Sequence, residues 1–175
     1  MQKKAKLYSK SHRDKITQII EKQIGRKPRN LLKVIKKCRY KLPRVILSSP
    51  ELSPTIFWLT CPHEIYLISR LESDGLIKKI KNKFIINTSL KENIITINKN
   101  FAGYRKKFYP PGLSIKRVKS LEGKGIDGIK DLSSLKCLHS HWAYHIAVKK
   151  NPIGNIIEGY VKKNPLCKKK CVYIT

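Results

Sequence analysis

Acidic residues are scarce in this chain, because 11 Asp and Glu stand against 39 Lys and Arg and give a formal net charge of +28. The scarcity argues against a magnesium-dependent hydrolase, which holds its ions with clustered carboxylates. Such an excess of positive charge destabilises a compact chain by self-repulsion unless polyanions or salt offset it. We therefore expect RNA or another polyanion as a partner, with phosphorylated small ligands or simple composition bias as the alternatives.

Long apolar runs are also missing. No segment approaches the roughly 20 apolar residues that a transmembrane helix needs, and the N-terminus, MQKKAKLYSK, lacks the apolar region of a signal peptide. The basic residues are spread along the whole chain, which does not fit a membrane-surface helix. These absences predict a cytoplasmic protein without a membrane partner.

The five cysteines include no CxxC pair, so a zinc-finger spacing is excluded. In a cytoplasmic protein cysteines are expected to be thiols or metal ligands before they are disulfides.

Apolar periodicity and capping signals predict the elements of one domain. We expect a mostly helical α+β domain over residues 12–163, flanked by a basic flexible arm (1–11) and a basic Cys-containing tail (164–175). The predicted helices are His12–Ile24, Pro62–Asp74, Ser89–Phe108, Ser133–Val148 and Ile156–Lys162, and the predicted strands are Val45–Leu47 and Thr55–Leu59.

The TCPHE segment predicts a reactive thiol. Pro62 suits the first helical position, which makes Cys61 the N-cap and places Glu64 at the capping-box position. The positive end of the helix dipole should lower the pKa of the Cys61 thiol, and His63 is its candidate general base. A cysteine that is merely tolerated at an N-cap is the plain alternative.

KCLHSHWAYH is the segment richest in potential metal ligands. On a helix that starts at Ser133, Cys137, His141 and His145 step round by about 40° each and form one stripe. Together with Cys38 and Cys61 they could bind zinc or an iron–sulfur cluster. The structural alternative is that the cysteines are buried as small hydrophobes and that His139, on the apolar face of this helix, is a satisfied core histidine.

Two basic segments are candidate phosphate or nucleic-acid sites. GRKPR is a basic turn, and EGKGIDG is a glycine-rich loop leading towards the Cys/His helix; without a βαβ unit its GxGxxG spacing does not favour a dinucleotide fold. A solvated turn is the alternative in both cases. The candidate residues are Arg26, Lys27 and Arg29 in the first segment and Gly123, Lys124, Gly125 and Gly128 in the second.

Several segments resemble the bacterial domain-of-unknown-function family 501. In order they are QIGRKPRNLLKV, KCRYKLPRVI, SPTIFWLTCP, LISRLESDGLI, KCLHSHWAYHIA and NPIG, from about Gln23 to Gly154. FWLTCP, SRLES and KCLH are the most specific. The resemblance implies a small cytoplasmic bacterial protein and carries no activity with it. The tail beyond Gly154 departs most from the family pattern.

Three functions stay open from the sequence. The first is a binding protein for RNA or another phosphate-rich partner, with a Cys/His-lined pocket. The second is an enzyme that acts on a phosphorylated substrate through a Cys thiol or a Cys/His-bound metal. The third is a winged-helix-like DNA-binding protein, suggested by LISRLESDGLIKKI, although strands and a loop precede this segment.

Overall fold

The structure is a computed structural model that describes residues 10–149, 151–164, 167 and 171. Within these residues the chain is mixed α+β and mostly helical, as predicted, and no helix is long and apolar enough to span a membrane. The α-helices are α1 (Lys10–Ile24), α2 (Pro62–Ser73), α3 (Leu76–Ile86), α4 (Thr88–Lys106), α5 (Ile115–Leu121), α6 (Leu138–Val148) and α7 (Pro152–Lys162). The antiparallel strands β1 (Leu31–Lys37), β2 (Pro43–Ser48) and β3 (Phe57–Leu59) lie in that order, and Ile126–Gly128 forms a 3-10 turn.

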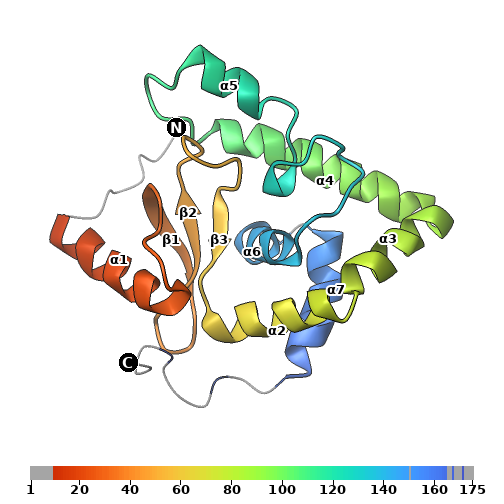
Figure 1. The fold of residues 1–175 in the computed structure, drawn as a ribbon, viewed down its shortest axis with the longest axis horizontal. Helices are drawn as coiled ribbons and strands as arrows, with labels where there is room; N and C mark the ends of the chain where they lie inside the picture. The colour runs from red at the N-terminus through yellow and green to blue at the C-terminus, as the bar shows by residue number, and fades with distance from the viewer. Residues whose placement is uncertain (1–9, 150, 165–166, 168–170, 172–175) are drawn as a thin grey trace.

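Helix α6 is the centre of the fold and is seen end-on in Figure 1, between the sheet and the other helices. Eight of its eleven residues are buried, so it is apolar on more sides than the predicted amphipathic helix. Leu138, Trp142, Tyr144 and Ile146 all belong to the main core. The helix therefore fixes the relative positions of the sheet, α2 and α7.

The sheet is covered on both faces. Helix α1 packs Ile16 and Ile20 against Leu31, Val34 and Ile46 in a separate small core on one face. The other face meets α6 through residues of the main core in β2 and β3. Figure 1 shows α1 on the outer side of the sheet and α6 on the inner side.

Some elements differ from the predicted ones. β1 and α5 were not expected, and α4 is capped by the Asn87 side chain, which accepts from the Leu90 N–H at 2.8 Å, rather than by Ser89. The LIKKIKNKF segment forms α3 where a winged helix would have its wing, and the strand β3 precedes α2. These neighbours do not fit a helix-turn-helix.

The predicted start of the Cys/His helix at Ser133 is wrong. The Asp131 carboxylate accepts from both the N–H and the hydroxyl of Ser133, which closes a turn at that point. Cys137 is extended (φ −142°, ψ 123°) and is the N-cap of a helix that begins at Leu138.

The predicted arm and tail fall mainly on residues outside the described ones. Lys10 and Ser11 already belong to α1, and the rest of the arm lies outside the described residues. Of the tail, only Asn164, Cys167 and Cys171 are described.

Candidate functional site

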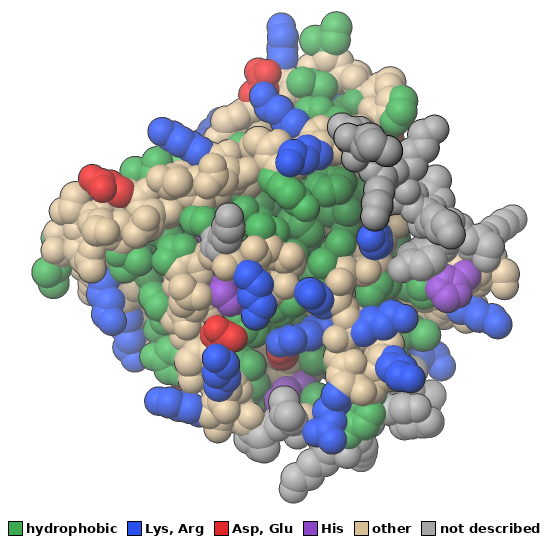
Figure 2. Space-filling model, turned by 180° about the vertical axis from the view of Figure 1, so that it is seen from behind, with side chains coloured by type: hydrophobic (Ala, Val, Ile, Leu, Met, Phe, Trp, Pro, Cys, Tyr) green, Lys and Arg blue, Asp and Glu red, His purple; other side chains and the backbone are tan. Residues whose placement is uncertain are grey.

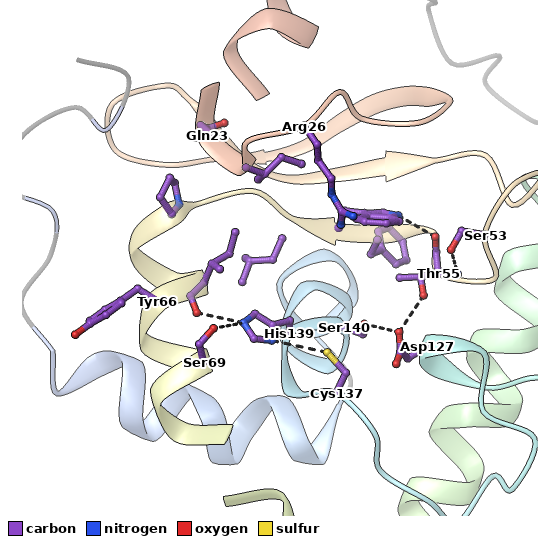
Figure 3. Close-up of a pocket in the computed structure, with 16 residues that line it drawn as sticks. Gln23, Arg26, Ser53, Thr55, Tyr66, Ser69, Asp127, Cys137, His139 and Ser140 are labelled. Carbon is purple, nitrogen blue, oxygen red and sulfur yellow. Dashed lines mark hydrogen bonds between the residues drawn. The ribbon is translucent and has the colours of Figure 1, made fainter. Parts of the chain in front are cut away.

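A hollow of about 800 Å³, here called the main pocket, lies between the end of α1, β3, α2 and the start of α6 (Figure 3). The segments FWLTCP, SRLES and KCLH, which carry the family resemblance, all contribute to its wall. The lining residues are Gln23, Ile24, Arg26, Ser53, Thr55, Phe57, Trp58, Leu59, Pro62, Ile65, Tyr66, Ser69, Asp127, Cys137, His139 and Ser140.

His139 is held on both sides of its ring at the wall of this pocket. Its Nδ1 lies 3.3 Å from Glu72 Oε1 and 3.8 Å from Cys137 Sγ. Its Nε2 donates to the Ile65 carbonyl at 3.1 Å and lies 3.3 Å from Ser69 Oγ. Figure 3 shows the imidazole between α2 and the Cys137 thiol. The ring orientation is therefore fixed by four contacts.

These contacts decide the charge of the ring. Burial alone lowers the pKa of His139, but the hydrogen bonds with Cys137 and Glu72 and the Glu72 charge outweigh burial and raise this pKa to about 10. Burial raises the pKa of Glu72, whereas the bonds from His139 and from the Leu138 N–H (2.6 Å) lower it overall. Histidine and glutamate are thus an ion pair at neutral pH.

Asp127 provides a second polar group in the main pocket. Its Oδ1 accepts from the Thr55 and Ser140 hydroxyls, both at 3.3 Å, and its Oδ2 lies 3.5 Å from Lys136 Nζ. Asp127 has a left-handed backbone (φ 60°) within GIDG. The glycine-rich loop therefore contributes a carboxylate to the pocket.

The backbone of that loop is occupied by bonds within the protein. The N–H of Gly125 donates to Ile129 O, that of Gly128 donates to Gly125 O, and that of Lys124 approaches Leu121 O at 3.3 Å. A Cβ at Gly125 would lie 2.5 Å from Asn98 Oδ1, so this glycine is required for packing against α4. Gly123 and Lys124 border a separate hollow of about 410 Å³.

The basic turn lies at the rim of the main pocket. Arg26 lines the main pocket and stacks on Trp58, with its guanidinium carbon 5.0 Å from the ring centre. Lys27 and Arg29 join Arg26 around a side pocket of about 200 Å³. Arg26 and Trp58 border both hollows, so the three predicted basic residues meet at one place.

The predicted metal set does not come together. Cys137 faces the main pocket, while His141 and His145 are buried within α6 and meet other partners. Burial lowers the pKa of His141 to about 4, and its Nδ1 meets Asn151. His145 stacks on Trp142, with ring centres 5.4 Å apart. The stripe fails because Cys137 precedes the helix.

Cys38, Cys61 and His63 lie around a different hollow of about 460 Å³, here called the cysteine cavity, together with Cys167. The expected lowering of the Cys61 pKa is wrong. Burial is the largest effect and raises this pKa to about 12, although the nearby backbone N–H groups act in the other direction. Cys61 caps α2 by position, and its side chain forms no cap hydrogen bond.

Sequence reasoning missed the partnership of Glu72 with Cys137 and His139. Neither Glu72 nor His139 was among the predicted catalytic or metal-binding residues. A usable signal existed, because SRLES and KCLH are two of the most family-specific segments and together supply all three residues.

The family comparison agrees with the resemblance seen in the sequence. No curated protein and no solved structure matches the chain significantly. A family model described as "Protein of unknown function (DUF501)" matches residues 34–158, which is more than half of the chain and includes the residues of the His139 cluster. The chain therefore belongs to the DUF501 family.

Proposed function

We propose that the protein binds single-stranded RNA across the rim of the main pocket. The observation that carries this proposal is the position of Arg26, Lys27 and Arg29, all exposed on one turn beside an aromatic-lined hollow. Arginine and lysine contact phosphates, whereas aromatic faces stack on unpaired bases. The five cysteines are free thiols, which fits the reducing cytoplasm where such a partner is found.

The pocket offers groups for both parts of a nucleotide. Trp58 lies under Arg26, and Tyr66 on α2 is 60% exposed at the pocket wall. The His139 imidazolium lies further inside, where it is paired with the Glu72 carboxylate. A hollow of about 800 Å³ lies within the range of ordinary small-ligand pockets, so a base or nucleoside could enter it.

Charge alone does not identify this rim. Figure 2, the view from behind Figure 1, shows Lys and Arg side chains spread over that face, with few acidic ones between them. Nonspecific attraction of any polyanion is therefore expected over much of the surface. A test must compare the rim with equally charged residues elsewhere.

The first prediction concerns Arg26→Ala/Lys27→Ala/Arg29→Ala. We expect this variant to bind a fluorescein-labelled single-stranded RNA 12-mer at least tenfold more weakly in fluorescence anisotropy. The slope of log K against log salt should become shallower by about 2, since three phosphate contacts to a single strand are lost. The control variant, Lys78→Ala/Lys79→Ala/Lys83→Ala, removes the same charge from exposed positions on α3 and should change affinity less than threefold.

Two results would overturn the proposal. One is the absence of binding at low salt, or binding that does not depend on salt. The other is equal weakening by the rim and α3 variants, because the charge would then act without a site. Polyphosphate and duplex RNA serve as competitors, and stronger binding of either would move the assignment to that polyanion.

An enzyme acting on a phosphorylated substrate is a second candidate, favoured by one specific observation. Cys137 and His139 place a thiol and an imidazole at the wall of a hollow with a basic rim, and the Glu72 carboxylate lies 3.3 Å from the imidazole. The thiol version that used Cys61 is weakened, because its raised pKa keeps the thiol protonated.

A further inference from the structure

We propose that Cys137, His139 and Glu72 bind a zinc ion, with an open coordination position facing the main pocket. Their candidate ligand atoms, one thiol sulfur, one imidazole nitrogen and one carboxylate oxygen, all lie within 4.8 Å of one another, and each residue is partly buried. Glu72 comes from the last turn of α2, and the other two residues surround the start of α6. This site goes beyond the proposed RNA binding and does not depend on it.

The distances match those between ligands around one tetrahedral zinc. Zinc bonds of about 2.0–2.3 Å separate a nitrogen and an oxygen ligand by about 3.4 Å, and a nitrogen and a sulfur ligand by about 3.6 Å. In the structure, His139 Nδ1 lies 3.3 Å from Glu72 Oε1 and 3.8 Å from Cys137 Sγ. An ion can therefore replace the Nδ1 proton with shifts of a few tenths of an ångström.

The surrounding contacts are those that a metal-bound histidine needs. A ligating imidazole usually donates its other N–H to a carbonyl or carboxylate, which fixes the ring and the tautomer. His139 Nε2 donates to the Ile65 carbonyl at 3.1 Å, and this leaves Nδ1 towards the thiol and the carboxylate. The Leu138 N–H holds Glu72 Oε1 at 2.6 Å. Both ligands are thus oriented before an ion arrives.

The donor set selects the kind of metal. Thiolate and imidazole are too soft for magnesium or calcium, whereas zinc accepts sulfur, nitrogen and oxygen together. Binding would release the Nδ1 proton of the imidazolium and the proton of the thiol. Two protons would then leave as one doubly charged ion enters, so the total charge of the cluster would stay the same. The competing interpretation, a hydrogen-bonded His–Glu ion pair without metal, predicts no affinity for zinc.

The open fourth position would allow the zinc ion to bind a water or a substrate. Three protein ligands with a free fourth position are typical of catalytic zinc, whereas structural zinc has four protein ligands. Cys137 and His139 line the main pocket, and Ser140 with its partner Asp127 lines the same hollow. A water bound there would face the space next to the basic rim, where a phosphate-bearing substrate could reach it.

The test is metal binding by the full chain. Protein purified without chelator, then stripped and titrated with zinc, should bind one equivalent at this site. Cobalt in place of zinc should show a thiolate-to-cobalt charge-transfer band. Cys137→Ser should abolish this band and weaken zinc binding at least 100-fold, and Ser69→Ala should weaken it about tenfold by loosening the ring. Cys38→Ser, in the cysteine cavity, is the matched thiol control and should keep both signals.

Three outcomes would overturn the proposal: no stoichiometric zinc after reconstitution, unchanged binding in Cys137→Ser, or a cobalt–thiolate band lost in Cys38→Ser instead. Thermal unfolding of each stripped variant shows whether it folds. If Cys137→Ser does not fold, the wild-type chain decides the question, because zinc must then protect Cys137 from alkylation by iodoacetamide. Alkylation at the same rate with and without zinc contradicts the site.

Discussion

Cys61 and His139 show how burial and partners compete in setting ionisation. Both side chains lose solvation, which favours the neutral form. For Cys61, burial and the nearby Glu64 charge outweigh the backbone N–H groups, so the pKa of its thiol rises to about 12. His139 meets a carboxylate and a sulfur, so its ring stays charged although it is partly buried. The ionisation of a side chain therefore depends more on its burial and on the charges next to it than on its place in the sequence, such as an N-cap.

This difference predicts that Cys61 alkylates slowly. With a pKa of about 12 in place of 9.0, its thiolate fraction at pH 8 is about a thousandfold smaller than that of an ordinary thiol. Peptide mass spectrometry after iodoacetamide treatment should show Cys61 modified at least 100-fold more slowly than the less buried Cys38. The Cys61 rate should also keep rising beyond pH 9, and a plateau below pH 8 would restore it as a catalytic thiol.

The same raised pKa has a consequence for stability. The unfolded thiol ionises near pH 9 and the folded one only near pH 12, so the stability contributed by this group is present below pH 9. It is lost as the pH rises through this window. Unfolding at high pH would also speed alkylation, because it exposes the thiol. Circular dichroism at each pH shows whether the chain is still folded and so separates the two effects.

At the scale of elements, the close contact between α6 and α7 depends on a glycine, which has no side chain. A Cβ at Gly154 would lie 2.2 Å from the His145 side chain, so α7 approaches α6 closely only because glycine stands there. Asn151 caps α7, accepting from the N–H groups of Ile153 and Gly154, and its amide also donates to His141 O. Packing and capping thus act at the same junction.

A pair of glycines in α7 tests this contact. Gly154→Ala should lower the free energy of unfolding by about 1–3 kcal/mol, because the methyl group has no room beside His145. Gly159→Ala, in the same helix with nothing within 4 Å, should raise it by about 0.5–1 kcal/mol through helix propensity. Urea unfolding monitored by circular dichroism measures both. Equal effects of the two substitutions would show that the close approach is not needed.

The elements that the sequence predicted well are those with a strong period or a clear stop. Three helices, α1, α2 and α4, carry apolar residues at helical spacing. In the same order, they end at a glycine, at Asp–Gly and before paired prolines. All three lie within two residues of their predicted bounds. β1 was missed because LLKVIKK has lysines at its exposed positions, and only pairing with β2 and packing against α1 make it a strand.

The site was harder to predict because it depends on one helix boundary. A helix from Ser133 would have aligned Cys137 with His141 and His145, whereas a start at Leu138 turns Cys137 towards His139 and Glu72. The turn at Asp131 that moves this boundary is a local hydrogen-bond feature, visible in the sequence as DLSS but weaker than the helical period. GRKPR was easier to predict as an exposed turn, because charge and a turn signal coincide in it.

Over the whole molecule, the positive charges far outnumber the acidic groups that could neutralise them. Among the described residues, the single carboxylate of Glu158 lies near three basic side chains, those of His145, Lys149 and Lys162. The Glu64 carboxylate pairs with Arg44. With 39 Lys and Arg and 11 acids, most cations face other cations at some distance. The folded state therefore carries a repulsive energy that salt can screen.

This repulsion predicts that salt stabilises the protein. The Debye length falls from about 10 Å at 0.1 M to about 3 Å at 1 M, so sodium chloride should raise the free energy of unfolding by about 1 kcal/mol or more, which is about 2–4 °C in Tm. The α3 variant Lys78→Ala/Lys79→Ala/Lys83→Ala lowers the formal charge from +28 to +25 and should gain less from salt. Differential scanning calorimetry in sodium chloride, with sucrose as the uncharged comparison, measures the gain. A Tm that falls with salt would mean that the few ion pairs, rather than the excess of cations, dominate the electrostatics of the fold.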